Sequence, residues 1–224
     1  MSPTTTSRTA RTKKLVTLAV LSTIAYVVMI ILKFPVVLFL SYEPKDAIIA
    51  LGGFLYGPLA AMVMSIIVAF VEMVTVSTTW IYGAVMNALS SCTFACTAAF
   101  VYSKKRTIPG AAIGLVAGVA VTVPVMLLWN YTMVPLYMGV PRAVVKDMLV
   151  PTFLPYNLLK YSISGAITVL LFKPISLALE KAKLMPQYNT TETSSKRLNT
   201  GTIIVSTLVL VSCILFILSW RGII

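Results

Sequence analysis

A small set of ionisable side chains interrupts a sequence that is otherwise strongly apolar. Glu43, Lys45 and Asp46 stand close together in residues 41–58, and Glu72 and Lys160 lie inside long apolar stretches. A charged group in a bilayer costs several kcal/mol, so such residues usually face a cavity or a partner. These side chains are therefore the first candidates for binding a solute.

Three asparagines and a tyrosine add hydrogen-bonding groups to this set. Asn87 lies inside an apolar stretch, Asn130 and Asn157 lie at the ends of two others, and Tyr42 precedes the charged cluster. Buried polar groups need partners, so we expect these residues to converge on one pocket. Two simpler interpretations stay open, since Lys160 could extend to the membrane surface and Asn87 could bond a neighbouring helix. Aromatic residues at the same ends either form an interfacial belt or stack on a planar ligand: Tyr42, Trp80, Tyr82, Trp129, Tyr131, Tyr137 and Tyr156.

Several kinds of chemistry lack the residues they need. Histidine is absent, and the three cysteines all lie in apolar stretches. We therefore expect no disulfide framework, no metal or haem site and no imidazole acid–base catalysis. No apolar stretch holds a pair of carboxylates, which makes an intramembrane enzyme the less favoured hypothesis. The phosphate-binding pattern GxxxxGK[ST] is also missing, so the chain cannot hydrolyse ATP by the usual route.

Composition indicates that membrane-spanning helices position these groups. The chain of 224 residues is 58% hydrophobic and 11% charged, about half the charged share of a typical soluble domain. Continuous apolar runs predict an all-α integral membrane protein, with a six-helix bundle and a seventh helix after it. The six spans are expected at residues 15–32, 46–56, 59–76, 83–102, 109–129 and 156–179. The second is short for a bilayer and ends at Gly57-Pro58.

Polar segments divide the chain into four regions. We predict a disordered cytoplasmic tail at residues 1–14, the six-helix domain at 15–183, a polar linker at 184–201 and an additional transmembrane helix, an appendage to the bundle, at 202–220. Residues 130–155 contain four prolines and are expected to form a long connection. A signal peptide in place of the first span is disfavoured, because no small-residue cleavage site follows it.

The charge distribution predicts an orientation. The formal net charge of +12 comes from 18 basic and 6 acidic residues. In a soluble protein this excess would suggest nucleic acid, but here the basic residues gather in loops on one side of the expected membrane. A cytoplasmic N-terminus satisfies the positive-inside rule if residues 46–56 count as a crossing. We therefore expect a multi-pass protein of the cell membrane with no nucleic-acid partner.

The polar stretch that begins at residue 41 also carries a family resemblance. SYEPKDAIIALGGFLYGPLAA resembles the first loop and second helix of the riboflavin-transporter family RibU. The likeness continues through YGAVMNALSS, KKRTIPGAAIGLVAG, WNYTMVPLYMG and PYNLLKYSISG, and covers roughly residues 15–183. These transporters are substrate-binding S components of energy-coupling factor (ECF) vitamin transporters. The resemblance implies a six-helix membrane fold that binds its vitamin near the extracellular face.

The same resemblance suggests roles for individual residues. It implies that Lys160 and Asn157, together with Asn130 and Asn87, make polar contacts to the flavin. It also implies that the loop with Lys45, Asp46 and the backbone around Tyr42 closes over the ligand. A small-residue face on the first helix, formed by Ala19, Ser22 and Thr23, would contact the coupling protein, although ordinary packing within the bundle explains it equally well.

The resemblance also implies a division of labour among subunits. A transmembrane coupling protein (EcfT) and two ABC-type ATPases would supply the energy, and riboflavin or FMN would be the transported ligand, with no cofactor. The alternatives are an S component for another vitamin or small precursor and, less favoured, the intramembrane enzyme. Glu72 has no assigned role beyond a possible pairing with Lys160 or a part in substrate entry. We also expect a chain truncated after Lys183 to keep its ligand binding.

Overall fold

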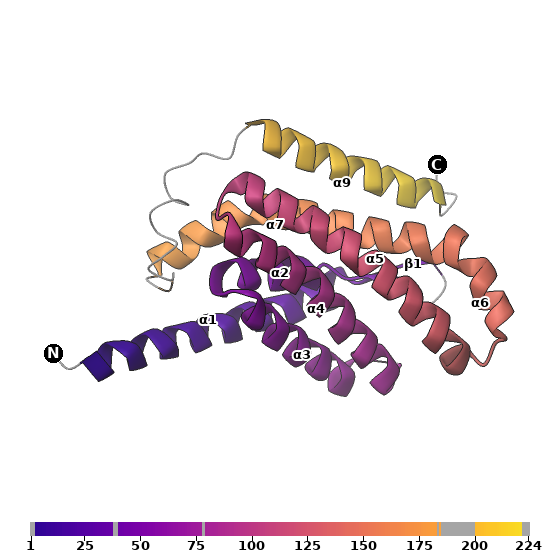
Figure 1. Cartoon of the computed structure of the whole chain (residues 1–224), viewed down its shortest axis with the longest axis horizontal. Helices are drawn as coiled ribbons and strands as arrows, with labels where there is room; N and C mark the ends of the chain where they lie inside the picture. The colour runs from indigo at the N-terminus through magenta and orange to yellow at the C-terminus, as the bar shows by residue number, and fades with distance from the viewer. Residues whose placement is uncertain (1–2, 38–39, 78, 183, 185–199, 221–224) are drawn as a thin grey trace.

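The computed structural model describes residues 3–37, 40–77, 79–182, 184 and 200–220 as a bundle of helices with one short hairpin. The helices lie roughly side by side, with α9 along the α7 side and α1 and α3 on the opposite side (Figure 1). The elements in chain order are α1 Pro3–Leu32, β1 Phe34–Val37, β2 Leu40–Tyr42, α2 Lys45–Tyr56, α3 Pro58–Thr75, α4 Trp80–Lys104, α5 Ile108–Met138, α6 Arg142–Met148, the π-helix η1 Leu149–Phe153, α7 Leu154–Lys181 and α9 Thr200–Trp220.

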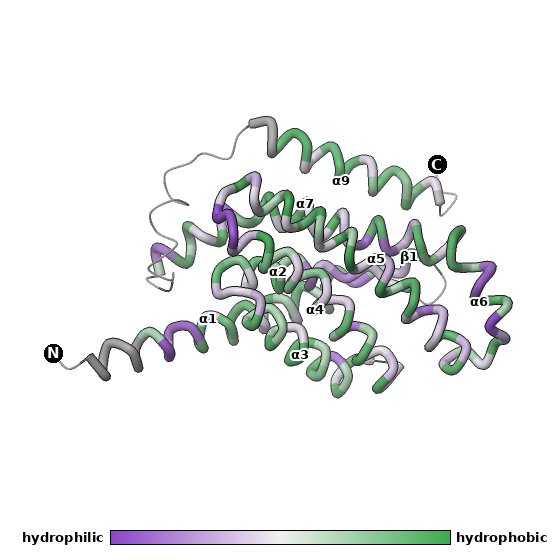
Figure 2. Tube along the Cα trace, in the orientation of Figure 1, coloured by the Kyte–Doolittle hydropathy of each residue, from purple (hydrophilic) through white to green (hydrophobic). Residues whose placement is uncertain are grey.

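The all-α membrane class predicted from composition is confirmed. Within the described residues, five helical segments are long and apolar enough to cross a membrane: α1 from residue 10 onward, α3, α4, α5 and the continuous run from α6 through α7. Apolar colour covers most of these helices, and strongly hydrophilic segments lie toward the two ends of the bundle (Figure 2). Helix α9 contains a shorter apolar stretch, Ile203–Ser219.

Helix α2 forms the centre of the bundle. It has 12 residues, about 18 Å of helix, and cannot cross a bilayer of about 30 Å on its own. Every residue from Lys45 to Leu55 is buried, because α1, α3, α4 and α7 surround it. The predicted break follows: Gly57 has φ +91°, which favours glycine, and Pro58 opens α3 where its missing N–H costs nothing.

Small residues bring α4 and α5 into close contact. A Cβ atom added to Gly114 on α5 would lie 2.5 Å from the carbonyl oxygen of Ala98 on α4. Such close approach of helix backbones is typical of membrane interfaces. It holds α4 and α5 close together at Gly114 and Ala98.

Two expectations about regular structure were wrong. The tail expected to be disordered is helical from Pro3, because the chain has no helix breaker between that proline and the apolar part of α1. The connection expected at residues 130–155 is mostly helical: α5 continues past Pro135 and ends at Gly139, and α6, η1 and α7 form one run. Prolines are tolerated there because a π-helical turn and neighbouring helices accommodate the displaced backbone bonds.

A β-hairpin that the sequence did not predict connects α1 to α2. Its strands pair antiparallel, with Phe34 opposite Tyr42 and Pro35 opposite Ser41. Val36 and Tyr42 are buried, whereas Phe34 is partly exposed. The hairpin therefore lies against the bundle and brings the charged residues that follow it to the helix ends.

Candidate ligand-binding site

A cavity opens between the hairpin and the helices α3, α4, α5 and α7. Its volume is about 840 Å³, a figure that includes the open space at its mouth. Its lining includes charged and amide side chains: Lys33, Glu43, Glu72, Asn87 and Lys160. It also includes aromatic and apolar side chains: Leu40, Tyr82, Met86, Trp129, Met133, Val134, Tyr137 and Tyr156. The cavity thus offers both polar and aromatic groups to a ligand.

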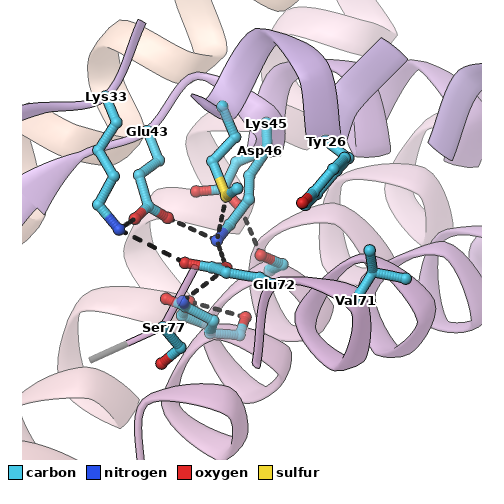
Figure 3. A network of polar contacts seen from close by, with 12 residues as sticks. Tyr26, Lys33, Glu43, Lys45, Asp46, Val71, Glu72 and Ser77 are labelled. Atoms are coloured by element: carbon cyan, nitrogen blue, oxygen red, sulfur yellow. Dashed lines mark hydrogen bonds and ion pairs between the residues drawn. The ribbon is translucent and has the colours of Figure 1, made fainter. Parts of the chain in front are cut away.

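A chain of ion pairs lies beside the cavity (Figure 3). Lys33, at the end of α1, lies 2.7 Å from one oxygen of Glu43, and Lys45 lies 2.5 Å from the other. Glu72 on α3 pairs with Lys45 and lies 3.6 Å from Lys33. Asn87 on α4 donates a hydrogen bond of 2.9 Å to Glu72. The residues on either side of the hairpin are therefore linked to α2, α3 and α4 beside the cavity.

The surrounding lysines keep the Glu43 carboxylate charged. Burial alone would raise its pKa, but Lys45, Lys160 and Lys33 outweigh that effect and lower the pKa from 4.5 to about 2. For Lys33, burial lowers the pKa, but the carboxylates of Glu43 and Glu72 raise it above its ordinary value. The pair between the hairpin and α1 is therefore ionised at neutral pH.

A second ion pair joins α7 to α2. Lys160 lies 3.5 Å from Asp46, and Ser91 on α4 donates a 2.5 Å hydrogen bond to the other carboxylate oxygen. Lys160 lines the cavity, whereas Asp46 is completely buried behind it. The carboxylate therefore positions the lysine and compensates its charge. Glu72 pairs with Lys45 and Lys33, and Lys160 pairs with Asp46, so the alternative pairing of Glu72 with Lys160 is wrong.

Some of the residues expected to contact a flavin line the cavity, and others lie behind its lining. Asn87 and Lys160 line the cavity, and Lys45 and Asp46 do not. Asp46 pairs with Lys160, and Lys45 pairs with Glu72, which also accepts the hydrogen bond from Asn87. Tyr42 is buried on the far side of the hairpin.

The other two asparagines lie outside the cavity lining. Asn157 donates to the carbonyl oxygen of Phe153, the last residue of the π-helical turn, at 2.7 Å. Asn130 is 1% exposed, and its amide oxygen has no hydrogen-bond partner among the described residues. Its neighbour Trp129 on α5 does line the cavity.

Several lining residues had no specific predicted contact. Lys33 was not assigned a role and Glu43 was a candidate only through its charge, and the structure shows that they pair. Tyr82, Trp129 and Tyr137 were candidates either for an interfacial belt or for stacking on a planar ligand. The rings of Tyr82 and Tyr137 lie 6.4 Å apart across α4 and α5. Assigning each aromatic residue to a face of its own helix could have grouped these three residues.

The small-residue face expected on α1 divides between two sides of the helix. Ala19 and Thr23 are exposed, and the hydroxyl of Thr23 bonds the carbonyl of Ala19 at 3.0 Å. Ser22 is 7% exposed and faces the bundle. An outside partner could therefore reach Ala19 and Thr23 in this arrangement, but not Ser22.

The fold and the cavity together define a multi-pass membrane protein with a cavity between its helices and its hairpin. Residues 13–176 match the family model described as the ECF transporter, substrate-specific component. The chain belongs to this family, which confirms the family resemblance described above.

Similar proteins agree with this assignment. A riboflavin transporter RibU of Staphylococcus aureus is 26% identical, over 75% of this chain and 93% of its own length. A riboflavin transporter FmnP of Bacillus subtilis is 28% identical, over 76% of this chain and 93% of its own. A solved structure described as the S component of a bacterial ECF transporter is 27% identical with a TM-score of 0.65, covering 76% of this chain and 99% of that one.

Proposed function

We propose that this chain binds riboflavin, or a close flavin relative, and acts as the substrate-specific subunit for its uptake across the cell membrane. The energy would come from a separate EcfT protein and two ABC-type ATPases. The observation that carries the proposal is the cavity, whose lining combines ion-paired and amide groups with aromatic rings. The names of two relatives support flavin as the ligand.

The cavity suits the chemistry of an isoalloxazine ring. The pyrimidine edge of this ring offers alternating hydrogen-bond donors and acceptors, which Asn87 and Lys160 can satisfy. The dimethylbenzene edge needs apolar surroundings, such as those that Met86 and Trp129 provide. Trp129 also offers a ring on which a planar ligand can stack.

The electrostatics of the cavity favour a ligand without net charge. Lys33 and Lys160 line it together with Glu43 and Glu72, and each lysine lies within ion-pair distance of a carboxylate. A ligand charge would therefore compete with pairs already formed in a poorly hydrated site. Riboflavin is uncharged at neutral pH, which favours it over FMN.

The test is a titration of the purified full chain with riboflavin, followed by flavin fluorescence. We expect saturable binding with quenching, because burial against Trp129 and tyrosines places the flavin beside electron-rich rings. FMN and an unrelated vitamin such as thiamine serve as comparisons. A preparation that binds no riboflavin but binds another vitamin would refute the flavin assignment and support an S component for that vitamin.

Two adjacent residues on α5 provide a matched pair of variants. Trp129→Ala removes a ring from the cavity, and we expect riboflavin binding to weaken by about 1–3 kcal/mol, the scale of a stacking contact in a buried site. Leu128 is 65% exposed on the outside of the bundle, so Leu128→Ala should leave the dissociation constant unchanged. Equal effects of both substitutions would place the ligand elsewhere.

A further inference from the structure

Helix α9 lies beyond the part of the chain that matches the family, which ends at residue 176. It runs along α7 in the opposite direction (Figure 1). One narrow stripe on it is shielded by the bundle, and the residues on its other faces are largely exposed: the stripe consists of Ser206, Leu210, Cys213 and Ile217. Spacings of four, three and four residues make one face of an α-helix, and small residues within it allow close approach.

The stripe reaches the hairpin at its C-terminal end. Ile217 is 7% exposed and belongs to an apolar cluster that includes Val36 of β1, Tyr42 of β2 and Tyr156 of α7. Val36, Tyr42, Tyr156 and Ile217 also line one small space between the hairpin, α7 and α9. Helix α9 therefore contacts the face of the hairpin that is turned away from the larger cavity.

The hairpin needs such support, because two short strands are at best marginally stable alone. On the cavity side, the Lys33–Glu43 pair joins its two ends. From α7, the hydroxyl of Tyr156 donates a 2.6 Å hydrogen bond to the carbonyl oxygen of Ser41. Leu40, Ser41 and Glu43 line the cavity, so a displaced hairpin would change the cavity itself.

We propose that α9 holds the hairpin against the bundle and that Ile217 is a positioning residue for ligand binding, which rests on the proposed function. If the hairpin moved away from the bundle, Val36, Tyr42 and Ile217 would become exposed and would no longer pack against one another. That packing stabilises the closed hairpin and slows the release of a bound flavin. The sequence predicted that a chain truncated after Lys183 keeps its ligand binding. The proposal instead expects such a truncation to weaken the hold on the ligand, because it removes α9.

Two variants of the full chain in lipid nanodiscs test the proposal. Ile217→Ala removes the contact with the hairpin, and Leu215→Ala changes a residue that is 50% exposed on another face of α9. The first measurement is hydrogen exchange of the hairpin amides without any ligand. The second is the rate of riboflavin release after dilution, followed by the recovery of flavin fluorescence.

For Ile217→Ala we expect hairpin exchange and riboflavin release to become about tenfold faster, the consequence of losing part of one buried aliphatic contact. Leu215→Ala should match the unchanged chain in both measurements, and exchange of α4 and α5 amides should stay the same in both variants. If Ile217→Ala folds poorly, Ile217→Val gives the same comparison with a smaller expected change.

Three outcomes would overturn the proposal: unchanged hairpin exchange in Ile217→Ala, an equal change in Leu215→Ala, or a rise in exchange across the whole bundle. The exchange measurement needs no ligand. If the chain binds no flavin, the proposed function fails, and the support of the hairpin by α9 is still decided by exchange.

Discussion

Lys160 and Asp46 illustrate how a cavity residue and its partner can be tested separately. Lys160 reaches the cavity and Asp46 does not, although both are buried. Lys160→Ala should weaken riboflavin binding by about 1–3 kcal/mol, because a polar edge of the ligand would lose its partner. The measurement is the dissociation constant from a fluorescence titration.

This substitution alone also leaves the Asp46 carboxylate buried without its cation, which is strongly destabilising. The double variant Lys160→Met/Asp46→Asn removes both charges and keeps similar volumes. We expect it to regain thermal stability and still bind riboflavin weakly. Recovery of full affinity in the double variant would mean that Lys160 acts only through Asp46 and does not contact the ligand.

At the scale of elements, Gly114 determines how closely α5 approaches α4 at Ala98. Gly114→Ala would gain up to about 1 kcal/mol in helix propensity. It would also place a Cβ 2.5 Å from the Ala98 carbonyl oxygen, and overpacking of this kind costs about 1–3 kcal/mol. We therefore expect a lower thermal unfolding midpoint in detergent.

The control is Ile113→Val, one position earlier on α5, where the side chain of Ile113 is 58% exposed on the outside of the bundle. It should leave the midpoint unchanged. A Gly114→Ala variant as stable as the unchanged chain would mean that the two helices can separate without cost.

The sequence predicted the elements whose signals are local. Apolar length indicated α1, α3, α4 and α5, and Gly57-Pro58 marked the end of α2. It could not predict the helical course of residues 142–155, because prolines that break a helix in water are tolerated when neighbouring helices satisfy the backbone. The hairpin was missed because its two strands are short and one contains Pro35.

The sequence could indicate which half of the bundle holds the candidate site residues, but not which way their side chains point. Asn87, Asn130, Asn157 and Lys160 were grouped because they share one half of the bundle. Which face of a helix points to the cavity depends on rotation about its axis, which packing decides. The structure turns Asn87 and Lys160 to the cavity, whereas Asn157 bonds its own helix.

At the scale of the whole molecule, the distribution of basic residues predicts that the N-terminus and the α4–α5 turn face the cytoplasm. In a chain whose native cysteines are replaced, we expect Arg142→Cys to react with an impermeant maleimide on intact cells. Lys105→Cys should react only after permeabilisation. Both positions are exposed. The reverse labelling pattern would invert the predicted orientation.

The ion pairs around the cavity have a consequence for the membrane potential. Lys33, Lys45 and Lys160 are matched by Glu43, Glu72 and Asp46, so the formal charges of the network sum to zero. Each uncompensated charge moved across the membrane would exchange about 2.3 kcal/mol with a potential of 100 mV. A site of this composition carrying an uncharged ligand does no electrical work when it moves through the field. Under the proposed function, the direction of transport would therefore depend on the coupled energy source and not on the voltage across the membrane.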